Sequence, residues 1–345
     1  MNLKQSFILG LILAIIGIAG WEMYWRSQDH IPNLDDNDDT WAIQRAKLER
    51  PSKDQVVFIG SSRILFDIQH PIWRAKTGTE PVQLASQGSS PLPILKDVVE
   101  NTDFNGLMVV GVTPGLFFGT ANPMARPMKW PQERVDYYYD RTYAQRLNHW
   151  LSIPLQQNFA FVTAATDTWD TDVDLKTLIV NARTGERAGP LPVPFYQFEE
   201  LSLDRNMQMN ARTTNDTVYA NFIKRAWQDM LKGDRPPPDK DGTISYFLEY
   251  AKKFQERGGS IILVRCPSDG FFKQGEAMGL PRVQFWDSLV VRSKLPAYHY
   301  DDYPQFRNLN LPEWSHLSKE DADFFTEELI EIMQKDGVLT KNMSE

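Results

Sequence analysis

The chain has 345 residues, 42% of them hydrophobic, which is enough for one large α/β domain with an insertion or for two smaller domains. Its formal net charge is −8 at pH 7 and no basic run is interleaved with aromatic residues, which argues against nucleic acid as a partner. The single cysteine, Cys266, excludes an intramolecular disulfide and a cysteine-rich metal site, and its apolar neighbours predict a place in the core.

The amino-terminal segment indicates the compartment. Residues 7–21 are almost wholly apolar, a lysine precedes them, and an aromatic cluster follows. This pattern is typical of a signal peptide or of a membrane helix whose aromatic side chains lie in the interface. A cleavage site would have to use Ala19-Gly20 after the bulky Ile18, so we interpret residues 1–27 as an uncleaved single-pass anchor. The main body is then predicted to be extracytoplasmic.

Beyond the anchor, apolar segments alternate with segments of helical periodicity. Residues 28–50 predict an acidic linker and a short helix, and residues 319–334 predict a closing amphipathic helix. The alternation between them is typical of βαβ units. We therefore predict an α/β fold, a three-layer α/β/α sandwich around a mostly parallel five-stranded sheet of flavodoxin-like winding. The predicted strands are residues 56–59, 81–86, 106–112, 260–264 and, more weakly, 297–300.

The alternation is interrupted between about residues 116 and 241. This segment is rich in aromatic residues and prolines and has only patches of helical period. Its aromatic side chains could stack on sugar rings, or they could pack a small core of their own, which is the commoner arrangement. We predict one domain over residues 51–345, with this segment inserted as a helical lid or subdomain over the edge of the sheet.

Polar residues follow the predicted strands, where the first backbone N–H groups of the next helix are free to bind a ligand. Gly60-Ser61-Ser62 follows the first strand, Gly88 the second and Thr113 the third; His316 precedes the last helix, with Glu313 three residues earlier. Acyl transfer through serine requires a hydroxyl, an imidazole, an acid that orients the imidazole, and N–H donors for the oxyanion. The chain offers each of these groups at a predicted strand end or in its last loop.

These residues resemble the conserved blocks of the SGNH, or GDSL-type, hydrolase superfamily. Gly60-Ser61-Ser62 is similar to the Gly-Asp-Ser of the first block, Gly88 to the glycine of the second, and Glu313-Trp314-Ser315-His316 to the Asp-x-x-His of the last. The Gly-Ser-Ser version behind an amino-terminal anchor is similar to the membrane-tethered branch that includes the D-alanyl transfer protein of lipoteichoic acid modification. The resemblance covers about residues 56–112 and 244–334.

The resemblance implies a role for each matched residue. Ser62 is the expected nucleophile, His316 the expected proton shuttle, and Glu313 the acid that orients His316. The backbone N–H groups of Ser62 and Gly88 are the expected oxyanion donors.

The chain departs from the superfamily pattern in two blocks. The third block usually supplies an asparagine within Gly-x-Asn, whereas this chain has Gly111-Val112-Thr113-Pro114. The Thr113 hydroxyl could take the place of the asparagine, or the oxyanion hole could lack this donor, at a typical cost of about 10² to 10³ in turnover. In the last block a glutamate replaces the aspartate, and Asp301 or Asp302 could substitute for it.

Two arginines also lie at predicted strand ends. Arg63 follows the serine pair, and Arg265 follows the fourth strand. Either could bind an anionic group of a substrate, although an ion pair with an acidic side chain is the commoner arrangement.

The sequence therefore predicts an esterase or O-acyltransferase that acts on acyl groups of a cell-envelope or exported polysaccharide. Its expected partners are the membrane, an acylated saccharide or other ester, and a complex for envelope synthesis. One alternative is a catalytically inactive module of the same fold that binds a glycan or such a complex, and another is a soluble esterase whose leader is removed. No metal or other cofactor is implied, because HExxH, paired cysteines and a glycine-rich dinucleotide turn do not occur in the sequence.

Overall fold

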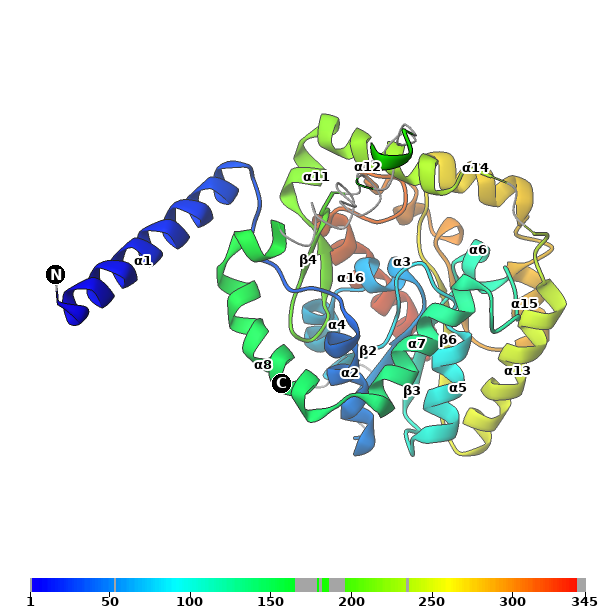
Figure 1. Ribbon diagram of the computed structural model, residues 1–345. Coiled ribbons are helices and arrows are strands. Elements are labelled where there is room, and N and C mark those ends of the chain that lie inside the picture. Colours follow the sequence, from blue (N-terminus) through cyan, green and yellow to red (C-terminus); the bar gives the residue numbers. More distant parts are fainter. Residues whose placement is uncertain are drawn as a thin grey trace. The chain divides into compact units, whose positions relative to one another are not determined.

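The computed structural model in Figure 1 describes residues 2–52, 54–164, 179, 182–185, 196–233 and 236–339. Contacts within the chain define two compact units. One consists of Asp36–Thr142 and Phe198–Glu345 and contains the sheet, so we call it the α/β unit. The other consists of Met1–Asp35 and Tyr143–Gln197, and we call it the amino-terminal unit.

The α/β unit is built on a five-stranded sheet in the order β2-β1-β3-β6-β7. Every neighbouring pair of strands is parallel, which confirms the predicted fold class and its flavodoxin-like winding. The apolar runs explain the arrangement, because a parallel sheet covered by helices buries both faces of its strands. The strands are β1 (Gln55–Ile59), β2 (Glu80–Gln83), β3 (Leu107–Gly111), β6 (Ser260–Arg265) and β7 (Ala297–His299).

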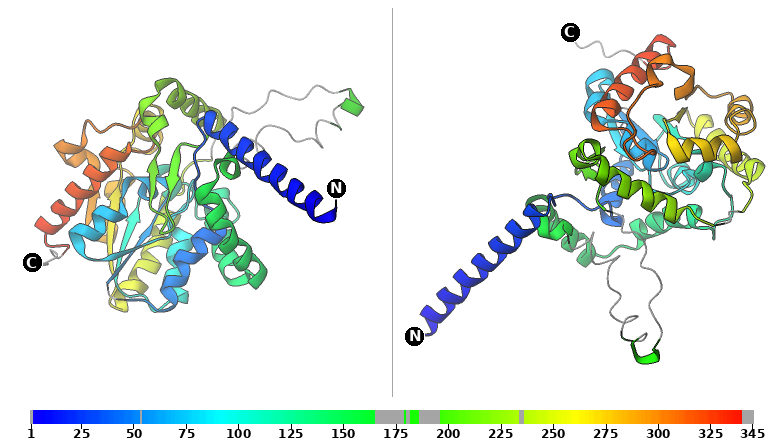
Figure 2. Two further views of the ribbon diagram at one scale, coloured as in Figure 1. Left: turned by 90° about the vertical axis from the view of Figure 1, so that its left-hand side faces the viewer. Right: turned by 90° about the horizontal axis from the view of Figure 1, so that it is seen from above.

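Helices cover both faces of this sheet (Figure 2, left). On one face α5 packs against α7 and α13, and α7 packs against α2. The apolar side chains of these helices and of α15 form a buried hydrophobic core with the strands. On the other face α16 packs against α3 and α4. The bounds of these helices are α2 (Asp38–Ala46), α3 (Ser62–Asp67), α4 (His70–Thr77), α5 (Leu92–Asn101), α7 (Arg126–Asp140), α13 (Lys240–Glu256), α15 (Trp286–Ser293) and α16 (Lys319–Lys335).

The segment predicted as a helical insertion also contains a β-hairpin. Strands β4 (Glu199–Leu201) and β5 (Met207–Met209) pair antiparallel, a feature that the prediction of a helical lid or subdomain did not include. Strands of three residues are too short to show an alternating pattern in the sequence. The other described elements of this segment are helices, and Tyr143–Gln197 belongs to the amino-terminal unit. In the α/β unit they are α6 (Pro114–Phe117), α7, α11 (Ala211–Asn215) and α12 (Thr217–Met230).

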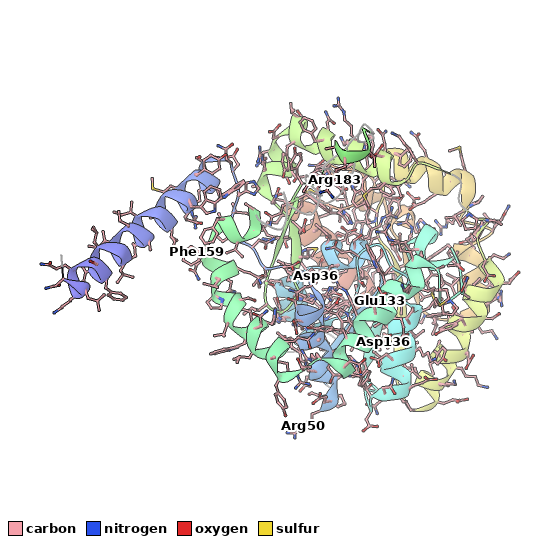
Figure 3. All side chains as sticks on the ribbon, viewed as in Figure 1. Asp36, Arg50, Glu133, Asp136, Phe159 and Arg183 are labelled. Atoms are coloured by element: carbon pink, nitrogen blue, oxygen red, sulfur yellow. The ribbon has the colours of Figure 1, made fainter. Side chains whose placement is uncertain are left out.

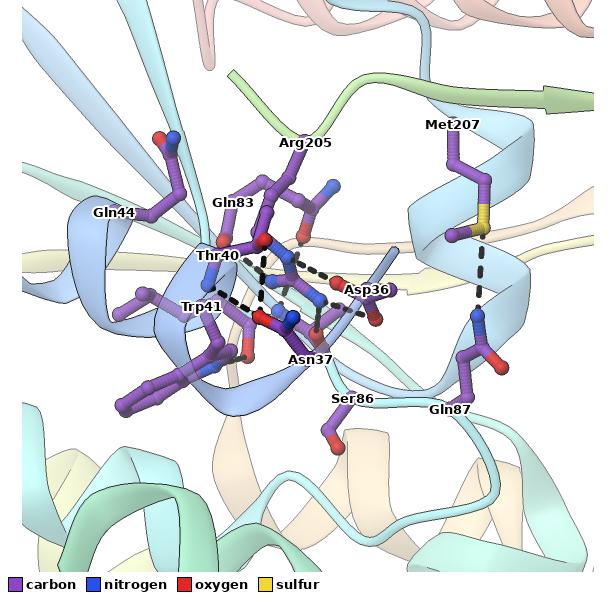
Figure 4. A network of polar contacts seen from close by, with 12 residues as sticks. Asp36, Asn37, Thr40, Trp41, Gln44, Gln83, Ser86, Gln87, Arg205 and Met207 are labelled. Atoms are coloured by element: carbon purple, nitrogen blue, oxygen red, sulfur yellow. Dashed lines mark hydrogen bonds and ion pairs between the residues drawn. The ribbon is translucent and has the colours of Figure 1, made fainter. Parts of the chain in front are cut away.

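A buried arginine holds the β-hairpin against the end of β2 (Figure 4). Arg205, in the turn between β4 and β5, is fully buried and forms a bidentate ion pair with Asp36, with N–O distances of 2.7 and 2.8 Å. It also donates to the carbonyl oxygens of Gln83 and Ala85 at 2.7 and 2.9 Å. Burial raises the pKa of Asp36, but the charges of Arg205 and Arg134 outweigh burial and hold that pKa below its usual value. The linker and the hairpin are thereby joined to the loop that follows β2.

The amino-terminal unit contains α1 (Leu3–Ser27) and α8 (Tyr143–Asn158). α1 is long and apolar enough to cross a membrane, and none of its residues is buried. Figure 3 shows its side chains projecting along its whole length. A signal sequence has the same properties, so the uncleaved anchor and the outward orientation of the main body stay predictions.

We predict that Arg205→Ala lowers the free energy of unfolding by about 3–5 kcal/mol, because the substitution removes the bidentate partner of the buried Asp36 carboxylate and leaves only Arg134 to pair with it. Urea unfolding of the detergent-solubilised full chain at pH 7 measures the change. The control is Arg307→Ala, at an exposed position, which should change stability by less than about 0.5 kcal/mol. Equal losses in the two variants would contradict the assigned role of the ion pair.

Candidate active site

The turn after β1 places Ser62 at the start of a helix. β1 ends at Ile59, Ser61 is the N-cap of α3, and Ser62 is its first residue. Gly60 between them has a φ of 155°, and a Cβ there would lie 2.5 Å from Ile64 Cγ2 and 3.1 Å from Gly111 Cα. Only glycine fits so close to the neighbouring strand, which makes the turn tight. The half-buried Ser62 therefore stands at the carboxyl edge of the sheet.

The loops after the two neighbouring strands approach this turn. The hydroxyl oxygens of Thr113 and Ser61 are 2.6 Å apart. Thr113 therefore contacts the residue that directly precedes Ser62, the predicted nucleophile. The loop after β2 is joined to the turn by a hydrogen bond from Ser86 N–H to the carbonyl of Gly60, at 3.0 Å. Gly88 in that loop is exposed and has a φ of 61°. The structure thus brings Thr113 beside the turn and places Gly88 in the adjoining loop.

The last loop holds His316 against Glu313, as the spacing predicted. The Nδ1 atom of His316 lies 3.1 Å from Glu313 Oε1, and both side chains are fully buried. The same oxygen accepts the backbone N–H groups of Ser315 and His316, at 3.1 and 2.6 Å. Asp301 and Asp302 are not needed for this role: the carboxylate of Asp302 pairs with Arg282 instead.

The Glu313 carboxylate stays ionised despite its burial. Burial raises its pKa, but the charge of His316 and the hydrogen bonds from His316 and from the Trp227 indole outweigh burial, and the net pKa lies below the usual value. The Trp227 N–H donates to the second oxygen, Oε2. A carboxylate held in this way fixes the tautomer of the imidazole, with Nδ1 as the donor and Nε2 as the proton acceptor.

Two aromatic residues of the predicted insertion contact the imidazole. Phe198 stacks on His316 with ring centroids 5.7 Å apart, and Trp227 lies at 6.2 Å. The sequence analysis missed both, because they are two of many aromatic residues in a segment without a clear pattern. No local signal distinguishes them, since their partner His316 lies about ninety residues or more further along the chain.

Helix α3 connects the serine to the histidine loop. Phe66, one helical turn after Ser62, stacks on His316 with centroids 4.2 Å apart. Side chains at i and i+4 share a face of a helix, about 5–6 Å apart at Cβ, so Ser62 begins the same face of α3 from which Phe66 contacts His316. Within the described residues His316 Nε2 is buried and has no hydrogen-bond partner, so the hydrogen bond between Ser62 and His316 is not formed. Catalytic hydrogen bonds are often open in enzymes without substrate.

The two arginines expected to bind substrate are buried in an ion pair with Glu276, on α14 (Gly270–Gly279). Arg63 Nη1 lies 2.7 Å from Glu276 Oε1, and Arg265 Nη2 contacts the other oxygen. Ser268 also donates to Glu276 at 2.8 Å. Both guanidinium groups are thus occupied by a residue of the chain itself, the ion pairing that the sequence analysis gave as commoner than a free anion site. Arg63 instead faces Ser315, with Nε and Oγ 3.5 Å apart.

Beneath the site, Asp67 is a buried carboxyl group whose burial outweighs the stabilising effects of the Leu317 N–H, Arg63 and Arg265 on its charged form. Its Oδ1 accepts the backbone N–H of Leu317 at 3.0 Å, but Oδ2 has no hydrogen-bond partner within the described residues. Burial raises the pKa of Asp67 well above its usual value, and burial likewise raises the pKa of the neighbouring Cys266 thiol. Cys266 is buried as the sequence predicted. Burial therefore favours the protonated form of Asp67 at the base of the histidine loop.

We predict that Asp67→Asn is neutral or stabilising near pH 8. In the unfolded chain Asp67 ionises above its ordinary pKa, whereas in the folded chain it keeps its proton up to the raised pKa. The stability of the wild type therefore falls with rising pH between these two values, by up to about 1.4 kcal/mol per pH unit. An amide cannot ionise, so the advantage of the variant should grow between pH 5 and pH 8.

Urea unfolding at several pH values tests this expectation, with Asp140→Asn as the control at an exposed carboxyl group. A variant that loses more stability at pH 8 than at pH 5 would show that Asp67 is buried as a carboxylate.

Comparisons with known proteins give little beyond this geometry. No family model matches the chain, and no curated protein sequence matches it. Among solved structures, one similar chain is a "putative acylhydrolase" from Bacteroides fragilis, at 13% identity and a TM-score of 0.39. The match covers 86% of this chain and 95% of that chain. Within the described ranges no group of three or more His, Cys, Asp or Glu side chains is placed to hold a metal ion.

Proposed function

We propose that the protein is a membrane-anchored serine esterase or O-acyltransferase in which Ser62, His316 and Glu313 act as a triad. The observation that carries the proposal is the buried pair of Glu313 and His316, whose free Nε2 neighbours the helix that begins with Ser62. A fully buried carboxylate carries a large desolvation penalty unless nearby charges and hydrogen-bond donors satisfy it. Here the pairing is complete for Glu313 and leaves one nitrogen of the imidazole available.

The reaction follows from the roles of these groups. Ser62 Oγ attacks the acyl carbon of an ester while His316 Nε2 accepts the hydroxyl proton, and the imidazolium that forms is stabilised by Glu313. The carbon–oxygen bond to the alcohol then breaks, and His316 returns the proton to the leaving oxygen. Water or a hydroxyl group of an acceptor attacks the acyl-serine in the second half, so that hydrolysis and transfer share one intermediate.

The oxyanion of the tetrahedral intermediate needs donors at the edge of the sheet. The backbone N–H of Ser62 belongs to the first turn of α3, whose N–H groups have no partner within the helix. The N–H of Gly88 and the hydroxyl of Thr113 are the further donors, and Thr113 can donate to the oxyanion only if Ser61 donates to Thr113 in their shared hydrogen bond. This hydroxyl would take the place of the asparagine that the SGNH superfamily uses.

The proposed substrate is an acyl ester on a polysaccharide of the cell envelope or an exported polysaccharide. Support comes from the amino-terminal helix, which would keep the enzyme at the membrane, and from the resemblance of the Gly-Ser-Ser block to the membrane-tethered branch of the superfamily. Outside the cytoplasm such an enzyme would meet envelope glycans directly. The side of the membrane is part of the proposal.

We predict that a fluorophosphonate probe labels the full-length protein on Ser62. Labelling and hydrolysis of an aryl acetate should both disappear in Ser62→Ala and fall by at least about 10³ in His316→Ala, because each loss removes a member of one unit. Ser293→Ala, on α15, is the control and should keep both signals. Equal labelling of wild type and Ser62→Ala would leave only the alternative, a binding module without catalysis.

We predict that Trp227→Phe lowers kcat about tenfold with little change in KM, since a hydrogen bond to a charged group contributes about 1.5–3 kcal/mol. The indole N–H helps to hold the pKa of Glu313 down, so its loss should also move the acid limb of the kcat profile to higher pH. A merely structural role would leave the position of that limb unchanged.

The control is Trp286→Phe, which changes a buried indole of α15 in the core cluster. A pH profile of Trp227→Phe that coincides with that of the control would contradict the role of Trp227 as a positioning residue.

A further inference from the structure

Helix α8 has an apolar face that is open to solvent. At 100° per residue its exposed apolar side chains fall within an arc of about 140°, wider than the apolar stripe of an ordinary surface helix. Exposed apolar faces of this extent mark contact with a partner or a membrane. The residues and their exposed fractions are Tyr143 (89%), Leu147 (56%), Trp150 (67%), Leu151 (53%) and Leu155 (51%).

The opposite face of α8 is the more buried one. His149 is buried, Ser152 and Ile153 are half-buried, and the Gln156 side chain accepts the backbone N–H of Asp35 at 2.8 Å. The covered positions thus lie on the side of the helix opposite the exposed apolar face. The apolar face points outward because the helix is held by its other side.

The carboxyl end of α8 is joined to the carboxyl end of α1. Arg26 donates to the carbonyl of Asn158 at 3.1 Å. Glu22 accepts the backbone N–H groups of Ala160 and Phe161 at 3.0 and 3.2 Å. Phe159, labelled in Figure 3, lies in this junction, and Figure 1 shows α8 running crosswise to α1.

This junction lies at the level of the aromatic cluster of α1, which consists of Trp21, Tyr24 and Trp25. Aromatic residues at the end of a membrane span lie at the boundary between lipid headgroups and acyl chains. A helix that leaves this level crosswise to the span runs along the membrane surface.

We propose that α8 is an interfacial helix whose exposed apolar face lies in the lipid headgroup layer beside the α1 span. The proposal rests on α1 being a membrane span, as in the proposed function. The charge of this segment also favours contact with a lipid surface. Residues 143–164 contain no Asp or Glu, although the chain has a net charge of −8. The α8 helix can therefore approach anionic headgroups without charge repulsion. Its Trp, Tyr and Leu side chains are those that interfacial helices bury in the acyl boundary.

Spin labels on the full-length protein in phosphatidylglycerol–phosphatidylethanolamine nanodiscs test the proposal. Leu147→Cys and Leu151→Cys carry the label on the apolar face, and Gln145→Cys carries it on an exposed position away from that face. The native Cys266 is buried, and unsubstituted protein serves as the labelling blank. We expect labels at positions 147 and 151 to collide with oxygen and to be shielded from a water-soluble nickel chelate, with several-fold lower chelate access than at position 145.

Two results would overturn the proposal. Equal chelate access at positions 145, 147 and 151 would place the apolar face in water. Exclusion of both oxygen and chelate at positions 147 and 151 would place it against protein, either a second copy or another membrane protein. Neither readout depends on catalysis, so a failure here is separate from a failure of the Ser62 labelling.

Discussion

The carboxylate of Glu313 is the constraint around which the candidate site is organised. It is fully buried and accepts hydrogen bonds from two backbone N–H groups, one imidazole and one indole. A buried charge without these donors would cost several kcal/mol. The hydrogen bonds to the carboxylate therefore hold the loop in the conformation that the structure shows. Trp314 within this loop has a φ of 77°, and Gly270 beside it leaves room for the indole, since a Cβ there would lie 2.5 Å from the ring.

The same loop is packed against the helix that begins with the serine. Arg63, Phe66 and Asp67 of α3 contact, in order, Ser315, His316 and Leu317. Glu276 then joins Arg63 to Arg265, at the end of β6. Helix α3, the histidine loop and strand β6 are therefore one packed assembly.

The described part of the insertion within the α/β unit completes the site. Its α12 supplies the indole that holds Glu313, and the segment before the β-hairpin supplies Phe198. The buried Arg205 fixes the hairpin to the loop after β2, which carries Gly88. The insertion is thus more than a cover, because without it Glu313 would lose a donor and His316 two of its aromatic neighbours. The apolar face of α8 belongs to the other unit, and we propose a separate role for it at the membrane.

The sequence by itself determined the fold class and the pairing of Glu313 with His316. Apolar runs that end in glycine and serine predict parallel strands with a ligand-binding site at the edge of the sheet where they end. The three-residue spacing of Glu313 and His316 predicts their contact. Both signals are local in the sequence. Only the tertiary structure decided that Arg63 and Arg265 pair with Glu276, that Trp227 holds Glu313, and that Arg205 is buried. These interactions join residues far apart in the chain, and a charged or aromatic side chain has the same local pattern whether it faces solvent or a distant partner. The physical reason is that burial and pairing are set by which segments meet, and no periodicity in the sequence records that.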